Sequence, residues 1–306
     1  MLKAEVRKKK KFSLEGKSQL SLIIFRFKKN KLAIVGLGIL LILAALCLSA
    51  SLWLPYEKVY QQSMLNRFKA PGTVVTGANG ATTLYLLGSD QLGRDLFARL
   101  IYGGQISLFA GLISVGMSMV VGIVLGGIAG YVGGKADNII MRICDIFMAV
   151  PQMLMAMAVV SALGQGTFKM LIALSMGGFP RFARTVRASI LNLRNQEFVE
   201  AAKCCGTSSF RILFKHVLPN GLGPVIVSAT LGLGATILSI ASLGFLGIGI
   251  ASPTPEWGTI LSENRSNIRF YPYLGLVPGF FICLSVVALN FVGDGLRDAL
   301  DPRTKS

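Results

Sequence analysis

Residues 100–134 read LIYGGQISLFAGLISVGMSMVVGIVLGGIAGYVGG, a run of 35 residues without one charged side chain. A helix needs about 20 apolar residues to cross the hydrocarbon core of a bilayer, so this run is long enough. Four more uncharged runs can also cross, namely 32–54, 146–168, 216–255 and 270–293. A shorter run, 170–180, becomes a sixth span if its helix continues past Arg181 and Arg184, whose long side chains can reach the interface. The sequence therefore predicts an all-α integral membrane protein with six transmembrane helices.

The composition of the whole chain agrees with membrane insertion. Of its 306 residues, 53% are hydrophobic and only 15% are charged, against about 25% charged in ordinary soluble domains. A chain this apolar has too little polar surface to cover a soluble core. The composition therefore excludes a disordered or fibrous protein and disfavours a soluble globule.

The basic residues are divided unevenly between the two sides of the predicted spans. With the N-terminus inside, 23 of the 31 lysines and arginines fall on the inner side, as cytoplasmic loops require. We therefore expect a multi-pass membrane protein with both termini cytoplasmic. Its predicted parts are a basic cytoplasmic tail (1–31), a first transmembrane helix (32–54), an extracytoplasmic loop (55–99), a core of five transmembrane helices (100–298) and a cytoplasmic tail (299–306).

Two glycine patterns add local predictions. In the longest run, glycines recur every four residues and form one smooth helix face for close packing or, as a compatible alternative, for lining a transport path. They are Gly122, Gly126, Gly130 and Gly134. In the outer loop, Pro71-Gly72, Thr76-Gly77 and Asn79-Gly80 are typical turn dipeptides, and we expect a short ordered loop with a hairpin there.

The sequence gives no basis for catalysis or metal binding. A single histidine, His216, excludes zinc sites that need two. No phosphate-binding loop is present, because Ala136 follows Gly134-Lys135 where Ser or Thr is required. Methionines around Cys144 favour apolar packing over a copper site. Asp145 is expected to form a local or interhelical ion pair. We predict no catalytic residue, no metal and no cofactor on this chain.

Residues 181–220 read RFARTVRASILNLRNQEFVEAAKCCGTSSFRILFKHVLPN. Apolar residues at spacings of three and four predict two short amphipathic helices. Gly206 ends the first, Thr207 or Ser208 can cap the second, and Pro219 is expected to stop it before the next span. Such a segment fits either a groove in a partner protein or the surface of the lipid, and the residues alone favour neither.

This segment resembles the EAA motif of ABC importer permeases, because Glu200-Ala201-Ala202 is followed by Gly206 and Leu218-Pro219. Further blocks resemble the C-type subunit of the dipeptide/oligopeptide/nickel permeases. They are LGSDQLGRD (87–95), GYVGG (130–134), LGFLGIG (243–249), PEWG (255–258) and GDGLRDALDPR (293–303). Ser89 stands where the family usually has Thr, and Gln105 where it often has Arg.

The resemblance implies the type I ABC importer permease fold, a place in the bacterial cell membrane and a set of partners. A second homologous permease would complete the translocation path, two ATP-binding subunits would hold ATP and Mg, and a solute-binding protein would dock outside. Nucleic acid is not expected as a partner. Coupling helices at 197–216 would contact an ATPase, with Glu256 and Trp257 on the side of the binding protein. The coupling residues would be Glu200, Ala201, Ala202, Gly206, Thr207, Ser208, Leu218 and Pro219.

Uptake of short peptides is the leading function under this resemblance. Nickel or another metal chelate is the alternative cargo. A further alternative is a channel that works without an ATPase, and such a channel would keep its pore activity after a change at Gly206.

Overall fold

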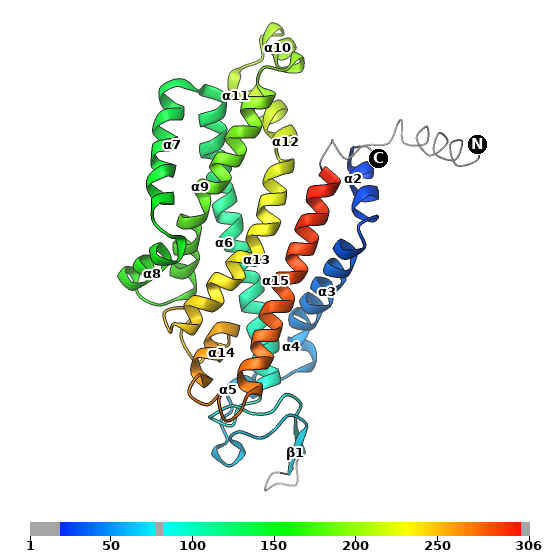
Figure 1. The fold of residues 1–306 in the computed structure, drawn as a ribbon, viewed down its shortest axis with the longest axis vertical. Helices are drawn as coiled ribbons and strands as arrows, with labels where there is room; N and C mark the ends of the chain where they lie inside the picture. The colour runs from blue at the N-terminus through cyan, green and yellow to red at the C-terminus, as the bar shows by residue number, and fades with distance from the viewer. Residues whose placement is uncertain (1–18, 77–81, 301–306) are drawn as a thin grey trace, which may run out of the picture.

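A computed structural model describes residues 19–76 and 82–300 of the chain. Long helices run side by side in an elongated bundle (Figure 1). They are α3 (Lys31–Leu48), α6 (Leu96–Val132), α9 (Thr167–Leu193), α13 (Gly223–Phe245) and α15 (Tyr273–Leu300). A bent pair, α7 (Gly134–Ala149) and α8 (Gln152–Leu163), packs against α9. The fold is therefore helical throughout its described membrane region.

Short elements lie at the two ends of the bundle (Figure 1). One end carries α2 (Gln19–Phe27), α10 (Glu197–Cys204), α11 (Ser209–Arg211), the π-helical η2 (Ile212–Val217) and α12 (Leu218–Gly221). The other end carries α4 (Ala50–Trp53), α5 (Glu57–Tyr60), the 3-10 helix η1 (Met64–Asn66), strands β1 (Thr73–Thr76) and β2 (Thr82–Tyr85), and α14 (Trp257–Asn264). The end that carries α14 is called the outer end below, and the end that carries α10 the inner end.

The predicted hairpin in the outer loop is present. Strands β1 and β2 pair antiparallel, with Thr73 opposite Tyr85 and Val74 opposite Leu84. The predicted turn at Asn79-Gly80 lies outside the described residues.

Four helices, α3, α6, α13 and α15, are long and apolar enough to cross a membrane, and the α7–α8 pair adds a fifth if it counts as one span. The helix expected from the short run 170–180 is α9, which continues past Arg181 and Arg184 as predicted. Helix α9 is not counted among these spans, because it carries too many charged residues. The prediction of a single span over 146–168 needs correction, because α7 and α8 meet at an angle of 87°. The chain bends at Val150-Pro151, where proline lacks an N–H and disfavours a helical residue before it.

Helices α6 and α9 pack closely along the glycine face. A Cβ atom on Gly126 would overlap the carbonyl oxygen of Ala183, and one on Gly130 would lie 3.0 Å from that of Arg187. Gly122 approaches the backbone of α9 in the same way. Gly134 departs from the predicted packing, because α6 ends at Val132 and Gly134, the first residue of α7, faces open space among the described residues.

We expect Gly126→Val to destabilise the protein, because the added side chain forces α6 and α9 apart, at a cost of about 1–3 kcal/mol. Gly116→Val is the matched control, since this glycine lies on the same helix and no described atom stands within 4 Å of the place that its Cβ would take. The thermal midpoint of the detergent-solubilised protein measures the difference. Equal midpoints for the two variants would contradict the close contact.

Candidate functional site

The first feature of functional interest is the bend after α10, at the inner end (Figure 1). Gly206 has a φ of +70°, in the left-handed region that glycine adopts without strain. Its N–H donates to the carbonyl of Lys203 at 2.9 Å, and the N–H of Thr207 donates to that of Ala202 at 3.1 Å. These bonds satisfy the last carbonyls of α10 in the manner of a Schellman motif. The sequence located this bend correctly.

The second helix of the segment differs from its prediction. Ser208 occupies the N-cap position of α11, but neither its hydroxyl nor another side chain of the described residues caps the helix there. Pro219 does not stop the helix, because it lies within α12, and α13 begins after Leu222. Proline is tolerated in the first turn of a helix, where its missing N–H is not needed, and Pro219 lies in the first turn of α12. The segment therefore continues into a membrane helix.

The segment has a buried side and an exposed side. Val199, Ile212 and Val217 are buried in a cluster that also contains residues of α9 and α13. Glu200 and Gly206 are exposed. The exposed side also carries aromatic rings, of which Phe210 and Phe214 lie 4.5 Å apart between ring centres. Of the remaining predicted coupling residues, Ala201, Ser208 and Pro219 are exposed. Ala202, Thr207 and Leu218 are half-buried. An exposed aromatic surface on a firmly packed base suits docking to another protein.

Ion pairs brace α9 against α7 next to this segment. Arg187 makes two hydrogen bonds of 2.5 Å to the carboxylate of Asp137. Arg184 contacts Asp145 at 2.5 Å, and Arg142 lies 3.8 Å from the same carboxylate. The predicted ion pair of Asp145 is therefore confirmed, in both its local and its interhelical form.

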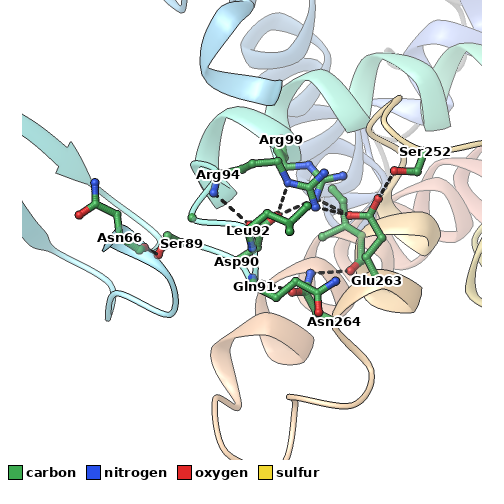
Figure 2. A network of polar contacts seen from close by, with 12 residues as sticks. Asn66, Ser89, Asp90, Gln91, Leu92, Arg94, Arg99, Ser252, Glu263 and Asn264 are labelled. Atoms are coloured by element: carbon green, nitrogen blue, oxygen red, sulfur yellow. Dashed lines mark hydrogen bonds and ion pairs between the residues drawn. The ribbon is translucent and has the colours of Figure 1, made fainter. Parts of the chain in front are cut away.

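The second feature is a buried network of four charges at the outer end, drawn in Figure 2. The carboxylate of Asp90 accepts from Arg94 Nε at 2.6 Å and from Arg99 Nη1 at 2.9 Å. The carboxylate of Glu263 accepts from Arg94 Nη2 and from Arg99 Nη1, both at 2.6 Å. Asp90 and Arg99 are fully buried, Arg94 is 2% exposed, and the side chain of Glu263 is 14% exposed. The network is electrically balanced, with two positive and two negative groups.

Local backbone bonds shape the loop that carries half of this network. Asp90 Oδ1 accepts from the backbone N–H groups of Leu92 and Arg94, at 2.9 and 3.0 Å. This turn leaves Oδ2 of Asp90 free for the two arginines. Asp95 then caps α6 by accepting from the N–H of Phe97 at 2.9 Å. The block 87–95 is thus a turn and a cap that aim both arginines inward.

The start of α14 is equally buried. Glu256 caps this helix by accepting from the N–H groups of Gly258 and Thr259, at 2.9 and 2.8 Å, and it also accepts from Ser107 Oγ at 3.1 Å. Trp257 Nε1 donates to the carbonyl of Leu100 at 2.9 Å. Burial raises the pKa of Glu256 above its usual value, and the hydrogen bonds that its carboxylate accepts oppose that shift.

Glu256 and Trp257, predicted to lie on the side of a binding protein, do not offer their side chains at the surface of this chain. Both are 0% exposed, because α14 folds back between α6 and α13 and leaves no face of these residues accessible. The count of basic residues places Arg94 and Arg99 on the outer side but does not predict their burial. The spacing of Asp90 and Arg94 was a local signal of a pair, but nothing nearby pointed to Glu263, which is 169 residues after Arg94.

Metal ligands do not gather in the described part of the chain. The five cysteines are free, with Cys47 and Cys144 buried. Among residues 19–76 and 82–300, no three side chains of His, Cys, Asp or Glu form a group that could hold a metal ion.

The family model for a binding-protein-dependent transport system inner membrane component matches residues 122–306. The chain belongs to this family of permeases. The matched range includes both the segment from α10 to η2 and α14. A second model, the N-terminal transmembrane domain of oligopeptide transport permease C, matches residues 18–71 of the permease. The two models together confirm the resemblance found in the sequence.

Three curated relatives are similar to the permease over 92% of its length. The dipeptide transport system permease of Alkalihalophilus pseudofirmus is 44% identical, with 89% of that protein covered. The glutathione transport system permease of Pectobacterium atrosepticum is 40% identical, with 90% covered. The oligopeptide transport system permease of Bacillus subtilis is 37% identical, with 89% covered. The chain is therefore a permease subunit of an ABC importer.

A chain of the methionine ABC transporter, solved in inward-facing conformations, is similar in fold. The TM-score is 0.54 at 20% sequence identity, and the match covers 66% of this permease and 96% of that chain. This likeness confirms the type I importer fold, and about a third of the permease lies outside the match.

We expect Arg99→Met or Glu263→Gln alone to destabilise the permease by about 3–5 kcal/mol, because each leaves the buried charges unbalanced. The double variant keeps the charge balance, since Asp90 and Arg94 still pair. We expect it to lose less than the sum of the two single changes. Arg265→Met, at an exposed position, is the control. Thermal midpoints measure all four variants, and strictly additive losses would contradict the network.

The carboxylate of Glu263 makes the stability of the permease depend on pH. Burial alone would raise the pKa of Glu263, but Arg99, with Ser252 and Arg94, outweighs burial, and the pKa lies below its ordinary value of 4.5. A carboxylate with a lowered folded-state pKa adds stability above its ordinary pKa, and that stability is lost as the pH falls through the folded-state value.

We therefore expect the difference in stability between wild type and Glu263→Gln to be full above pH 4.5 and to shrink on acidification below it. Thermal midpoints of both proteins from neutral pH to about pH 3 measure this difference, which isolates Glu263 from other carboxylates that titrate in the same range. A difference that stays constant with pH would contradict the assignment.

Proposed function

We propose that this permease imports short peptides, together with a second homologous permease, two ATP-binding subunits and an extracytoplasmic solute-binding protein. The observation that carries the proposal is the shared cargo class of its relatives. Dipeptide, glutathione and oligopeptide permeases are all 37–44% identical to it over 92% of its length. Dipeptides, oligopeptides and glutathione are all short peptides, so the relatives agree on the class of cargo while differing in its size.

In this proposal, the inner end of the bundle lies in the cytoplasm, and α10 to η2 is the segment that the ATPase moves. Glu200 and the aromatic side chains Phe210 and Phe214 are exposed there for contact with a groove in the partner. The buried side of the segment, including Val199 and Val217, packs on α9 and α13. A displacement of the segment would therefore reach those two helices directly.

ATP itself belongs to the partner chains. Closure of the ATPases would favour one arrangement of the permease helices and ATP hydrolysis the other, which is a shift between populations driven by differential binding. This chain contributes the translocation path and the surface that contacts the ATPase, and it needs no catalytic residue for either task.

Nickel or another metal chelate remains the alternative cargo, and a channel that works without ATPases remains the alternative mechanism. Gentle purification from the native membrane separates these cases. Two ATPases and a second permease in the purified complex support the importer, and the ligand on a copurified binding protein identifies peptide or metal. A chain that purifies alone at full yield favours the channel.

We expect Gly206→Pro and Glu200→Arg to abolish ATPase association and uptake of a radiolabelled dipeptide, while the protein still inserts into the membrane. Proline cannot adopt the φ of +70° at position 206, and the second change reverses an exposed charge on the docking side. Glu197→Arg is the matched control, because Glu197 is exposed on the same helix outside the motif. Wild-type uptake by Gly206→Pro would rule out the coupling role.

A further inference from the structure

Both ends of α14 are bonded to α6. At its start, Ser107 Oγ donates to Glu256 at 3.1 Å, and Trp257 Nε1 donates to the carbonyl of Leu100 at 2.9 Å. At its end, Glu263 accepts from Arg99, also on α6, at 2.6 Å. The helix has eight residues, so these bonds hold it along its whole length.

The loop before α6 is attached to the same helix (Figure 2). Arg94 reaches Glu263 at 2.6 Å. The side chain of Asn267, just after α14, donates to Gln91 Oε1 at 3.2 Å, and the N–H of Gln91 faces the carbonyl oxygen of the Asn264 side chain at 3.5 Å. Two segments that are far apart in sequence, 90–99 and 263–267, therefore meet around one set of polar contacts.

Packing against α13 leaves α14 no room to slide. A Cβ on Gly258 would overlap the backbone of Ala241, and one on Gly244 would overlap the carboxylate of Glu256. Trp257 and Ile260 are also fully buried in a cluster that includes Leu274 of α15. Such close-packed contacts favour discrete arrangements over gradual displacement.

Electrostatics opposes separation of these segments. Moving α14 away from α6 would leave two buried arginines to share the single carboxylate of Asp90, and an unbalanced buried charge is strongly unfavourable. Arg99 Nε and Nη2 have no acceptor among the described residues, so Nη1 alone links this side chain to both carboxylates. Opening the contact between α6 and α14 would therefore be strongly unfavourable.

We propose that the loop 86–95, the first three turns of α6 and α14 form one rigid unit, the outer clamp, and that this unit moves as a single body during transport. In this view, α14 is not a gate that swings separately at the outer end. Arg94, Arg99 and Glu263 act as positioning residues, because they fix the unit without contacting cargo. The proposal rests on the proposed importer function, since it concerns motion during uptake.

A reversible cross-link within the clamp tests this. Gln91→Cys and Asn267→Cys, both half-exposed positions, are combined in a complex whose exposed native cysteines, Cys204, Cys205 and Cys283, are replaced by serine. A short methanethiosulfonate cross-linker joins the two sites in the full complex. We expect dipeptide uptake to be retained after cross-linking, as in the two single-cysteine variants treated with the same reagent. Loss of uptake that a reductant restores would overturn the outer clamp.

A distance measurement separates failure of the clamp from failure of the proposed function. Spin labels on the same two cysteines report their separation in the nucleotide-free and the ATP-trapped complex. We expect one unchanged distance distribution, whereas a nucleotide-dependent shift would overturn the clamp even if the cargo were not a peptide. If the unmodified wild-type complex takes up no peptide, the proposed cargo fails while this distance still decides the outer clamp.

Discussion

The neutralisation of two buried arginines decides how the outer end of this permease is built. Charges inside a low-dielectric environment are tolerated only with partners, and Arg94 and Arg99 are almost completely buried. One carboxylate, Asp90, comes from the adjacent turn, and the other, Glu263, comes from a helix near the opposite end of the chain. The fold must therefore bring α14 back onto the start of α6. The cap at Glu256 and the bond from Trp257 to Leu100 then set the angle at which it returns.

The inner end follows a different physical rule. Its ion pairs are partly exposed: the Arg184 and Asp145 side chains are 46% and 44% exposed, so water screens them and they contribute little stability. The segment from α10 to η2 is held instead by buried apolar residues, while its polar and aromatic side faces outward. An outer end held by buried charges and an exposed inner segment fit the proposal that a partner acts from the inner side.

Local signals in the sequence were enough to predict much of this structure. The uncharged run from residue 100 matches α6, and the glycine at 206 marks the end of α10, because span length and left-handed caps are properties of short segments. The pairing of Arg94 with Glu263 could not be predicted, because it depends on tertiary contact across 169 residues. The burial of Trp257 was missed for the same reason: a polar-flanked segment between two spans reads as a surface loop until its partners are known.

The error at Pro219 shows how the two ends of the permease are connected. Pro219 was expected to separate the predicted coupling segment from the next span, but it lies within α12, which follows η2 directly, and only Leu222 separates α12 from α13. The outer end of α13 lies against α14, where Gly244 and Gly258 permit backbone contact. One nearly continuous helical path therefore leads from the exposed inner segment to α14. Since α14 is bonded to α6 by buried charges, a displacement of η2 by the proposed partner would be resisted at the outer end, and α13 would have to bend or carry the proposed outer clamp with it.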